Sequence, residues 1–543
     1  MTFKNLFLKR QESIITAAAL IGLTLLGSGL LGFIRDRLAA NFFGDSTPLG
    51  LFYLADKLPN FIFSVLVIGG FSTAVIPVFT KYLKNDVATA WELSSQILSV
   101  VLVGFAGLGV ILFIFATPIA SLLTSSKLSP SDFATLVTLL RILLLGQLLL
   151  IVSNFLTCLL QSHKHFLIPA LSPIFYNLGL IVGIVAASRF GIIAAAWGAV
   201  LGACMHLAIQ IPALKQIDFK FKPQINLRAP AFLETMHLLG PRTLTIIVSQ
   251  LSILIDSWLA AWVSVAAIVP YTFALHLQNV PLGIFGVSIS AALFPTLSQK
   301  ALIEDKTEFK KTFLTSFLQL SFLILPAAAV LLVLRVPAIR LVFGASRFSW
   351  EATLTAAYTL AFLALALFPQ AAALSITKAF YALKDSKTPF IINCAGTIIN
   401  IIVAILFIRV FHLGVWGLSL AYFISSSIEC ILLFTYLAKT LNGFSIVDFG
   451  KPFIKICAAT FIMAGCLYLP LKQLDLYALD TSRTINLVIL TAIAGLAGVI
   501  SYLILTWLFK VQEIRLLYSL VNKIIKKPAT APEIPNYETT TNP

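Results

Sequence analysis

The chain has 543 residues, of which 59% are hydrophobic and only 11% are charged. A water-soluble protein of this length needs far more polar surface, so the composition excludes a soluble globular fold and indicates a protein embedded in a lipid bilayer. The formal net charge of +16 comes from basic residues scattered over many short segments without a basic and aromatic module, which excludes nucleic acid as a partner.

Apolar blocks long enough to cross a hydrocarbon core about 30 Å thick recur along the whole chain. The first six are expected at about residues 14–40, 50–80, 93–118, 135–161, 167–188 and 190–212. The next six are expected at about 240–264, 269–298, 312–335, 352–379, 388–409 and 413–437, and the last two at 452–471 and 484–509. The sequence therefore predicts an all-α polytopic membrane protein with about fourteen transmembrane helices.

The basic residues of the loops predict the orientation of these helices. With the N-terminus placed inside the cell and the helices alternating in direction, the inside segments hold 25 Lys and Arg residues and the outside loops hold 8. Cytoplasmic loops of membrane proteins carry such an excess of basic residues. We therefore expect an even number of spans, a multi-pass protein, and both termini in the cytoplasm.

The longest internal connection divides the first twelve helices into two groups of six. The expected organisation is an N-terminal lobe at 1–212, a cytoplasmic linker at 213–239, a C-terminal lobe at 240–437, helices thirteen and fourteen at 438–510, and an amphipathic segment with a disordered tail at 511–543. Two six-helix lobes joined by a linker are typical of transporters.

Five basic residues were not counted with the loops, namely Arg35, Arg37, Lys57, Arg141 and Arg242. A charge at membrane depth costs roughly 2.5–3.5 kcal/mol on insertion scales, so it requires a partner or a water-filled cavity. Two interpretations of Arg37 stay equally open: it belongs to a charged cluster at the membrane interface, or it has a deeper role. Arg35 is expected to face a cavity. Lys57 precedes Pro59, which bends the helix, and two interpretations stay open: it meets an anionic substrate, or it pairs with Asp36.

Three polar residues in the second half of the chain also lie at membrane depth. Asp256 shares one face of the seventh span with Ser249 and Ser252, which suits a bound cation or a proton relay. The alternative is a buried pair between Asp256 and a basic residue. In the eighth span His276 and Gln278 either line a cavity or bond across helices, and we favour the cavity.

Motifs for soluble-enzyme chemistry are absent from the sequence. It contains no Walker loop, no HExxH and no GxSxG, and the Gly-x-Gly-x-x-Gly spacing of Gly27–Gly32 lies inside the first apolar block and not in the strand-to-helix context of a nucleotide-binding fingerprint. We therefore expect a transporter and not an enzyme, driven by an ion gradient or the membrane potential and not directly by ATP.

Several segments, in matching order and spacing, give the chain a family resemblance. They are Gly32–Asp36 in the first span, Lys57–Asn60 in the second, Pro281–Val287 in the eighth, and Ala379–Pro389 between the tenth and eleventh. These segments resemble the MurJ (MviN) family of lipid II flippases. That family belongs to the multidrug, oligosaccharidyl-lipid and polysaccharide exporter (MOP) superfamily, which also includes the MATE transporters.

The resemblance implies two lobes around a cationic cavity that moves lipid II from the inner to the outer leaflet of the bacterial cytoplasmic membrane by alternating access. Lipid II is the undecaprenyl-pyrophosphate-linked precursor of peptidoglycan. The residues assigned to substrate binding are Arg35, Asp36, Lys57, His276 and Gln278. The implied partners are lipid II, membrane lipids and enzymes of cell-wall synthesis.

The chain departs from the family pattern at several cavity positions. The family usually has arginine at the positions of Gly29 and Phe63 and near His276, and an acidic residue at Gly50 and Ile68. The cavity should therefore be less cationic than in typical members, with Lys57, His276, Gln278 or Arg242 as substitutes.

The resemblance also implies a site for a sodium ion, and no other cofactor, between the seventh, eleventh and twelfth spans. Its residues are Asp256, Asn400, Val415 and Ser419, while Ala404 takes the place of a second acidic or amide residue. Hard cations require several oxygen ligands, and this set supplies them only in part.

Two other functions stay open at the level of the sequence. One is a flippase for another lipid-linked glycan or an exporter of small amphiphiles, which the missing arginines favour. The other is a transport-inactive scaffold for cell-wall enzymes, which predicts that Arg35→Ala and Asp256→Ala leave function intact.

Overall fold

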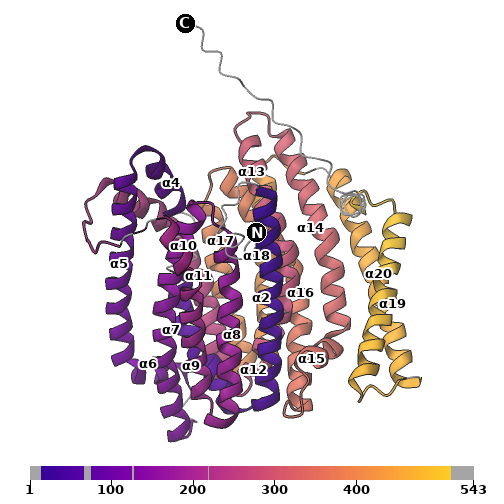
Figure 1. Ribbon diagram of the computed structural model, residues 1–543. Helices are drawn as coiled ribbons and strands as arrows, with labels where there is room; N and C mark the ends of the chain where they lie inside the picture. Colours follow the sequence, from indigo (N-terminus) through magenta and orange to yellow (C-terminus); the bar gives the residue numbers. More distant parts are fainter. Residues whose placement is uncertain are drawn as a thin grey trace, which may run out of the picture.

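The computed structural model describes residues 14–65, 75–124, 128–217, 219, 221–444, 446–477 and 479–514, apart from the side chains of 14–21, 238–242, 244, 245, 446 and 448. Every regular element within these residues is a helix (Figure 1). Twelve of the helices are long and apolar enough to cross a membrane by length and composition. The predicted all-α membrane fold is confirmed.

The described helices share one dominant direction and pack side by side (Figure 1). In chain order they are α2 (Ile14–Phe43), α3 (Thr47–Phe63), α4 (Ile76–Asn85), α5 (Val87–Ile114), α6 (Ala116–Leu123), α7 (Pro130–Ser162), α8 (Leu167–Phe190), α9 (Ile193–Ala208), α10 (Ile211–Leu214), η2 (Lys215–Ile217), α11 (Pro230–Val263), α12 (Ile268–Pro281), η3 (Leu282–Val287), α13 (Ser288–Lys300), α14 (Thr307–Val333), α15 (Arg335–Phe343), α16 (Trp350–Ala382), α17 (Lys387–Arg409), α18 (Trp416–Thr440), η4 (Ile446–Gly450), α19 (Lys451–Tyr477) and α20 (Thr484–Leu508).

The twelve long helices cover the third to fourteenth predicted spans. The first predicted span corresponds to the 30-residue helix α2. The second is represented by α3 and α4, and residues 66–74 between them, which include Ile68, lie outside the described part of the chain. The side chain of Arg242 and the predicted tail beyond residue 514 are also outside it.

The linker is shorter than predicted, because α11 begins at Pro230 and not near residue 240. Proline is well suited to the first position of a helix, where its missing N–H is not needed. Part of the linker lies along α5. The backbone N–H of Lys222 donates to Ser95 Oγ at 3.3 Å, and that of Gln224 donates to Ser99 Oγ at 3.1 Å.

The eighth predicted span is not one regular helix. It consists of α12, the wider π-helical segment η3, and α13. The change occurs directly after Pro281, which has no N–H to donate and whose ring crowds the preceding turn.

The two lobes repeat each other with a nearly constant interval. Ser162 and Ala382, which end α7 and α16, are 220 residues apart, and both helices have 33 residues. The pairs α2 and α11, α5 and α14, and α8 and α17 follow the same interval to within a few residues. Lys164 and Lys384 take the same left-handed conformation after the paired helices, with φ of 62° and 63°.

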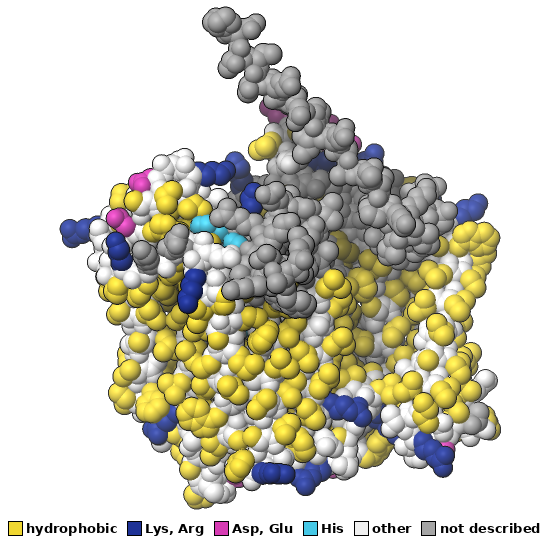
Figure 2. All heavy atoms as spheres, viewed as in Figure 1, with side chains coloured by type: hydrophobic (Ala, Val, Ile, Leu, Met, Phe, Trp, Pro, Cys, Tyr) yellow, Lys and Arg dark blue, Asp and Glu magenta, His cyan; other side chains and the backbone are white. Residues whose placement is uncertain are grey.

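Apolar side chains cover the middle of the molecule, and lysines and arginines gather toward its two ends (Figure 2). We name the end at which α2 begins the upper face and the end at which it ends the lower face, as they appear in Figure 1. An apolar belt between two basic rims is the surface expected of a protein that spans a bilayer.

The N-terminal lobe contains a very close helix pair, α8 and α9. A Cβ atom added at Gly183 would lie 2.3 Å from Cα of Gly198, and one added at Gly179 would lie 2.3 Å from Cα of Gly202. Each helix therefore presents a Gly-x-x-x-Gly face to the other, which allows the two backbones to touch.

The two lobes meet at the lower face. Arg347 donates to the carbonyl of Phe42 at 2.7 Å, and Ser349 Oγ donates to the carboxylate of Asp45 at 2.8 Å. Gly50 of α3 packs against the loop between α11 and α12 so tightly that an added Cβ would lie 2.1 Å from the carbonyl oxygen of Val265. The lobes are thus closed against each other at this face, and the contact leaves no room for the acidic side chain that the family commonly has at position 50.

Candidate functional site

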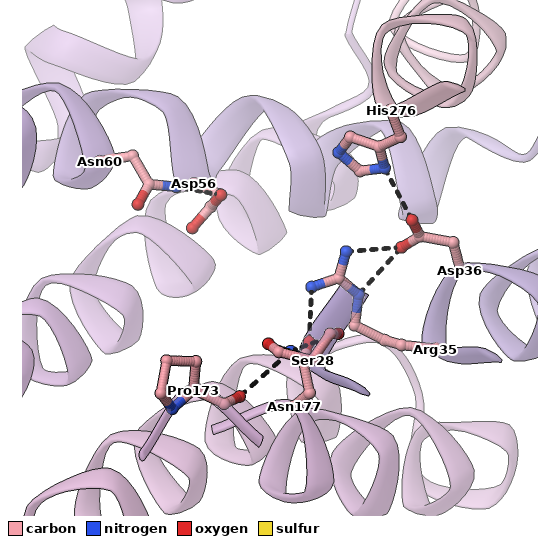
Figure 3. Close-up of polar contacts among 8 residues, drawn as sticks. All are labelled: Ser28, Arg35, Asp36, Asp56, Asn60, Pro173, Asn177 and His276. Atoms are coloured by element: carbon pink, nitrogen blue, oxygen red, sulfur yellow. Dashed lines mark hydrogen bonds and ion pairs between the residues drawn. The ribbon is translucent and has the colours of Figure 1, made fainter. Parts of the chain in front are cut away.

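Arg35, Asp36 and His276 form one polar group between the lobes (Figure 3). The guanidinium of Arg35 contacts Asp36 Oδ1 through Nε at 2.9 Å and Nη2 at 2.8 Å. The other carboxylate oxygen, Asp36 Oδ2, lies 2.7 Å from Nδ1 of His276. Because Asp36 belongs to α2 and His276 to α12, this carboxylate links the N-terminal and C-terminal lobes.

Asn177 of α8 fixes the far side of the guanidinium. Its Oδ1 accepts from Arg35 Nη1 at 3.3 Å, while its Nδ2 donates to Ser28 Oγ at 3.1 Å and to the carbonyl of Pro173 at 3.1 Å. The amide is therefore oriented by its own donors, so that its oxygen faces Arg35. The sequence analysis did not single out Asn177.

These side chains lie at one depth in the molecule. Arg35 is eight residues before the end of α2 at Phe43, and His276 is eight residues after the start of α12 at Ile268. At 1.5 Å per residue, both are about 12 Å from the lower ends of their helices. The side chain of Asp36 is 2% exposed, but those of Arg35 and His276 keep 21% and 32% of their surface. Two of the three groups are thus accessible to a ligand.

Aromatic rings fill the space between this group and the lower face. Phe273 of α12 stacks on Phe343 of α15 with ring centroids 4.2 Å apart, and Tyr53 of α3 meets Phe273 edge-on at 6.2 Å. Phe33 and Phe348 contact the same pair of rings. The rings come from both lobes, so they form an apolar seal beneath the polar group.

The other basic residues predicted at membrane depth have different surroundings. Lys57 of α3 has no carboxylate within ion-pair distance among the described residues, so the predicted alternative of a pair with Asp36 is not observed. Arg37 donates across the lobes to the carbonyl of Leu341. Arg141 donates to the carbonyl of Phe113 at 3.2 Å and does not belong to the polar group.

Gln278 is not brought to the polar group, which corrects its assignment to the substrate site. It is 1% exposed, and its Nε2 donates to the carbonyl of Leu363 at 2.9 Å and to Gln370 Oε1 at 3.2 Å. Two residues along a helix correspond to about 200° of rotation, so Gln278 and His276 point in different directions. Gln278 therefore bonds within the C-terminal lobe, to α16.

The structure adds polar residues on α3 and α7 that the sequence analysis missed. Asn60 Nδ2 donates to the carboxylate of Asp56, and Gln147 Nε2 donates to Asn60 Oδ1 at 3.0 Å (Figure 3 shows the first pair). Asp56 directly precedes Lys57 in the helix. A carboxylate within a predicted span is a sequence signal that could have identified it.

A second polar group lies within the C-terminal lobe. Asn400 Nδ2 of α17 donates to Asp256 Oδ1 of α11 at 2.9 Å, and Ser425 Oγ of α18 reaches Asn400 Oδ1 at 3.5 Å. Asp256 and Asn400 are 4% and 2% exposed. The structure thus brings together two of the four residues assigned to a sodium site.

The other two residues of that assignment, Val415 and Ser419, lie at the start of α18. The Val415 carbonyl accepts from the N–H of Leu418 at 3.1 Å, and Ser419 Oγ donates to the carbonyl of Trp416 at 2.9 Å. Each oxygen keeps a lone pair for a cation. Among the described residues no group of three or more His, Cys, Asp or Glu side chains is placed to hold a metal ion. A cation here would depend on one carboxylate and neutral oxygens.

A fourth carboxylate, Glu429, lies further along α18. Asn393 Nδ2 of α17 donates to Glu429 Oε1 at 3.2 Å, and an added Cβ at Gly396 would lie 3.2 Å from Glu429 Oε2. The sequence analysis missed this residue too, although it is an acidic residue inside a predicted span.

Comparisons with known proteins agree on one family. The family model described as lipid II flippase MurJ matches residues 39–508. A probable lipid II flippase MurJ of Buchnera aphidicola subsp. Acyrthosiphon pisum (strain APS) is 29% identical over 477 residues, which cover 85% of this chain and 91% of that protein. The lipid II flippase MurJ of Burkholderia cenocepacia is 26% identical over 466 residues, with 82% and 88% covered.

Solved structures show the same fold. A structure titled lipid II flippase MurJ, inward closed conformation, superposes with a TM-score of 0.76 at 24% identity, covering 90% of this chain and 98% of that chain. An inward-facing multidrug resistance MATE family transporter of the MOP superfamily superposes with a TM-score of 0.62 at 16% identity, covering 78% and 94%.

Proposed function

Because the chain belongs to the family of lipid II flippase MurJ, we propose that it moves lipid II from the inner to the outer leaflet of the bacterial cytoplasmic membrane by alternating access. It is a multi-pass membrane protein of the transporter class, and the family match over residues 39–508 is the observation that carries the function. Enzymes that use lipid II in cell-wall synthesis would be its functional partners.

In this proposal Lys57 and Arg35 attract the pyrophosphate of lipid II. Three nitrogens of Arg35 already contact Asp36 and Asn177, so its charge is largely compensated. Lys57 has no ion pair in the described part of the chain, so its ammonium group is available to an anion. Lys57 would therefore supply much of the attraction that arginines supply in typical family members.

The head group would enter from the upper face, which we assign to the cytoplasm together with both termini. The lower-face contacts and the aromatic seal of Phe273 and Phe343 close the opposite route, while Arg35 and His276 keep accessible surface. The linker lies at the upper face and carries Lys215 and Lys222, as cytoplasmic loops do. The polyprenyl tail can remain in lipid while the head group crosses between the lobes.

We infer in addition that Asp256 and Asn400 hold a sodium ion. Asp256 follows Asp36 by the 220-residue interval of the two lobes. In the N-terminal lobe the Arg35 guanidinium binds both the carboxylate of Asp36 and the amide oxygen of Asn177. The residue before Asp256 is Ile255, so the C-terminal lobe has no such built-in cation. A bound sodium would take that role, with the Asn400 amide turned to present its oxygen.

The function is tested in a bacterium depleted of its own lipid II flippase. Expression of this chain should restore growth and the exposure of lipid II at the outer surface, and Arg35→Ala should abolish both. Arg141→Ala is the matched control, since Arg141 also lies at membrane depth but outside the polar group. Rescue by Arg35→Ala at equal expression would favour a scaffold, and no rescue by the correctly inserted wild-type chain would argue against lipid II as substrate.

The sodium site has a separate test. Replacement of sodium by choline should reduce lipid II exposure in wild type, and the reduction should be smaller in Asp256→Asn. Equal sodium dependence in both proteins would refute the assignment to Asp256.

A further inference from the structure

Asp56 is a carboxylate at membrane depth that the proposed function does not use. It is nine residues after the start of α3 at Thr47, or about 14 Å from the lower end of that helix. In the described part of the chain the one hydrogen-bond donor to its side chain is Asn60, one turn further along α3. An ionised carboxylate at this depth normally has a stronger counter-charge.

The hydrogen bonds that begin at the Asp56 carboxylate run through the Asn60 amide to the Gln147 amide. Gln147 of α7 is 2% exposed, and its Nε2 donates to Asn60 Oδ1 at 3.0 Å. Its Oε1 is buried and has no hydrogen-bond partner among the residues that the structure describes. A buried polar atom without a partner costs about 1–3 kcal/mol, and such atoms often mark the place of an ion or a water molecule.

We propose that Asp56, Asn60 and Gln147 bind a sodium ion in the N-terminal lobe. The three side chains offer a carboxylate and two amide oxygens, which are the oxygen ligands that hard cations prefer. With Asp56 ionised and alone, Asn60 turns its NH2 group toward it, as observed. With a cation at Asp56, rotation of both amides turns the oxygens of Asn60 and Gln147 toward the cation, which gives Gln147 Oε1 the partner that it lacks among the described residues.

The position of this site couples it to the head group. Lys57 directly follows Asp56, and Arg35 lies in the same region (Figure 3), so their positive charges oppose cation binding in the empty protein. A pyrophosphate bound to Lys57 and Arg35 would cancel that field. Cation and head group would then bind together, and by linkage each would raise the affinity of the other by the same factor. This coupling rests on the proposed function, whereas the site itself does not.

The test measures binding of ²²Na⁺ to the full-length protein in lipid nanodiscs, with and without inorganic pyrophosphate. Pyrophosphate should raise the sodium affinity about fivefold or more, the lower end of typical coupling between sites. Asp56→Asn should remove this response and retain the sodium bound at Asp256. Gln147→Glu, which adds a carboxylate to the site, should bind sodium tightly even without pyrophosphate.

Two controls separate the possible results. Glu304→Gln alters an exposed carboxylate in the loop before α14 and should behave as wild type. Asp256→Asn should no longer bind the sodium that is independent of pyrophosphate, and it should still bind the sodium that depends on pyrophosphate. Loss of one site can therefore be told from loss of the other. The proposal is overturned if Asp56→Asn, folded as judged by its melting temperature, keeps the pyrophosphate response. It is equally overturned if pyrophosphate binding responds to pH but not to sodium, because Asp56 would then carry a proton.

Discussion

The carboxylate of Asp36 on α2 lies 2.7 Å from the imidazole of His276 on α12, and this contact joins the two lobes above the aromatic seal. Hydrogen bonds that involve charged groups contribute about 1.5–3 kcal/mol. The contact is therefore strong enough to favour the arrangement in which the lower face is closed over one in which the lobes separate at the lower face.

His276→Ala should shift the protein toward the lower-open arrangement by about tenfold, because it removes this contact. Spin labels at the exposed positions Ser131 and Glu351, in the first turns of α7 and α16 at the lower face, would report the separation of the lobes. His276→Asn is the matched control, since its amide can donate to Asp36 in place of Nδ1. Identical distance distributions for His276→Ala and wild type would show that the contact does not bias the lobes.

Gly50→Ala should prevent closure of the lower face. The new methyl group would lie 2.1 Å from the carbonyl oxygen of Val265, and neither backbone can withdraw while the lobes remain in contact. The same spin-label pair should report a mainly open lower face, and lipid II exposure should fall because the cycle cannot return. Gly29→Ala is the control, because no atom of the described residues lies within 4 Å of a Cβ at that position. A closed lower face in Gly50→Ala would contradict the packing described above.

Gly183→Ala should destabilise the N-terminal lobe without direct effect on the polar group. Its Cβ would lie 2.3 Å from Cα of Gly198, and overpacking of this kind costs about 1–3 kcal/mol. The melting temperature of the purified protein should fall by several degrees. Gly107→Ala on α5, where an added Cβ would have no atom of the described part of the chain within 4 Å, should melt at or slightly above the wild-type temperature, since alanine favours helix. An unchanged melting temperature in Gly183→Ala would mean that α8 and α9 can separate at little cost.

Lys57→Met should reduce lipid II exposure about tenfold, because it removes a positive charge that is in no ion pair among the described residues and keeps the length of the side chain. Lys57→Arg should retain most of the activity, since an anion is still attracted. Complementation and surface exposure of lipid II measure both variants. Full activity of Lys57→Met would show that Lys57 is not needed and would assign anion binding to Arg35 and His276 alone.

The sequence predicted the helices well because hydropathy depends on composition and not on tertiary contacts. It placed Arg35, Asp36 and His276 in one site, and the structure joins these three by direct contacts. It misjudged Gln278, because hydropathy does not show which way a polar residue of a buried helix points. The amide of Gln278 is held by Gln370, which is distant in sequence.

Asp56 and Glu429 are carboxylates within predicted spans, but the side chains that they contact became visible only in the structure. Asp56 is connected through Asn60 to Gln147, a residue of another helix, and Glu429 is recognised by its bond to Asn393. Each of these contacts depends on how two helices are rotated against each other. A single sequence gives that rotation only indirectly. The interval of 220 residues between matching helices of the two lobes, by contrast, is a distance along the chain itself.

The interval of 220 residues also limits how the protein can alternate between its states. Both copies of the repeat begin at the upper face, so the symmetry axis that relates them is parallel to the membrane normal. In transporters with inverted repeats, the two halves can exchange conformations and thereby convert an inward-open state into an outward-open one. If two parallel lobes exchange their conformations, the cavity opens to the same side of the membrane as before. Such an exchange therefore gives no new state. A change in tilt between two nearly rigid lobes is therefore the motion that this architecture permits.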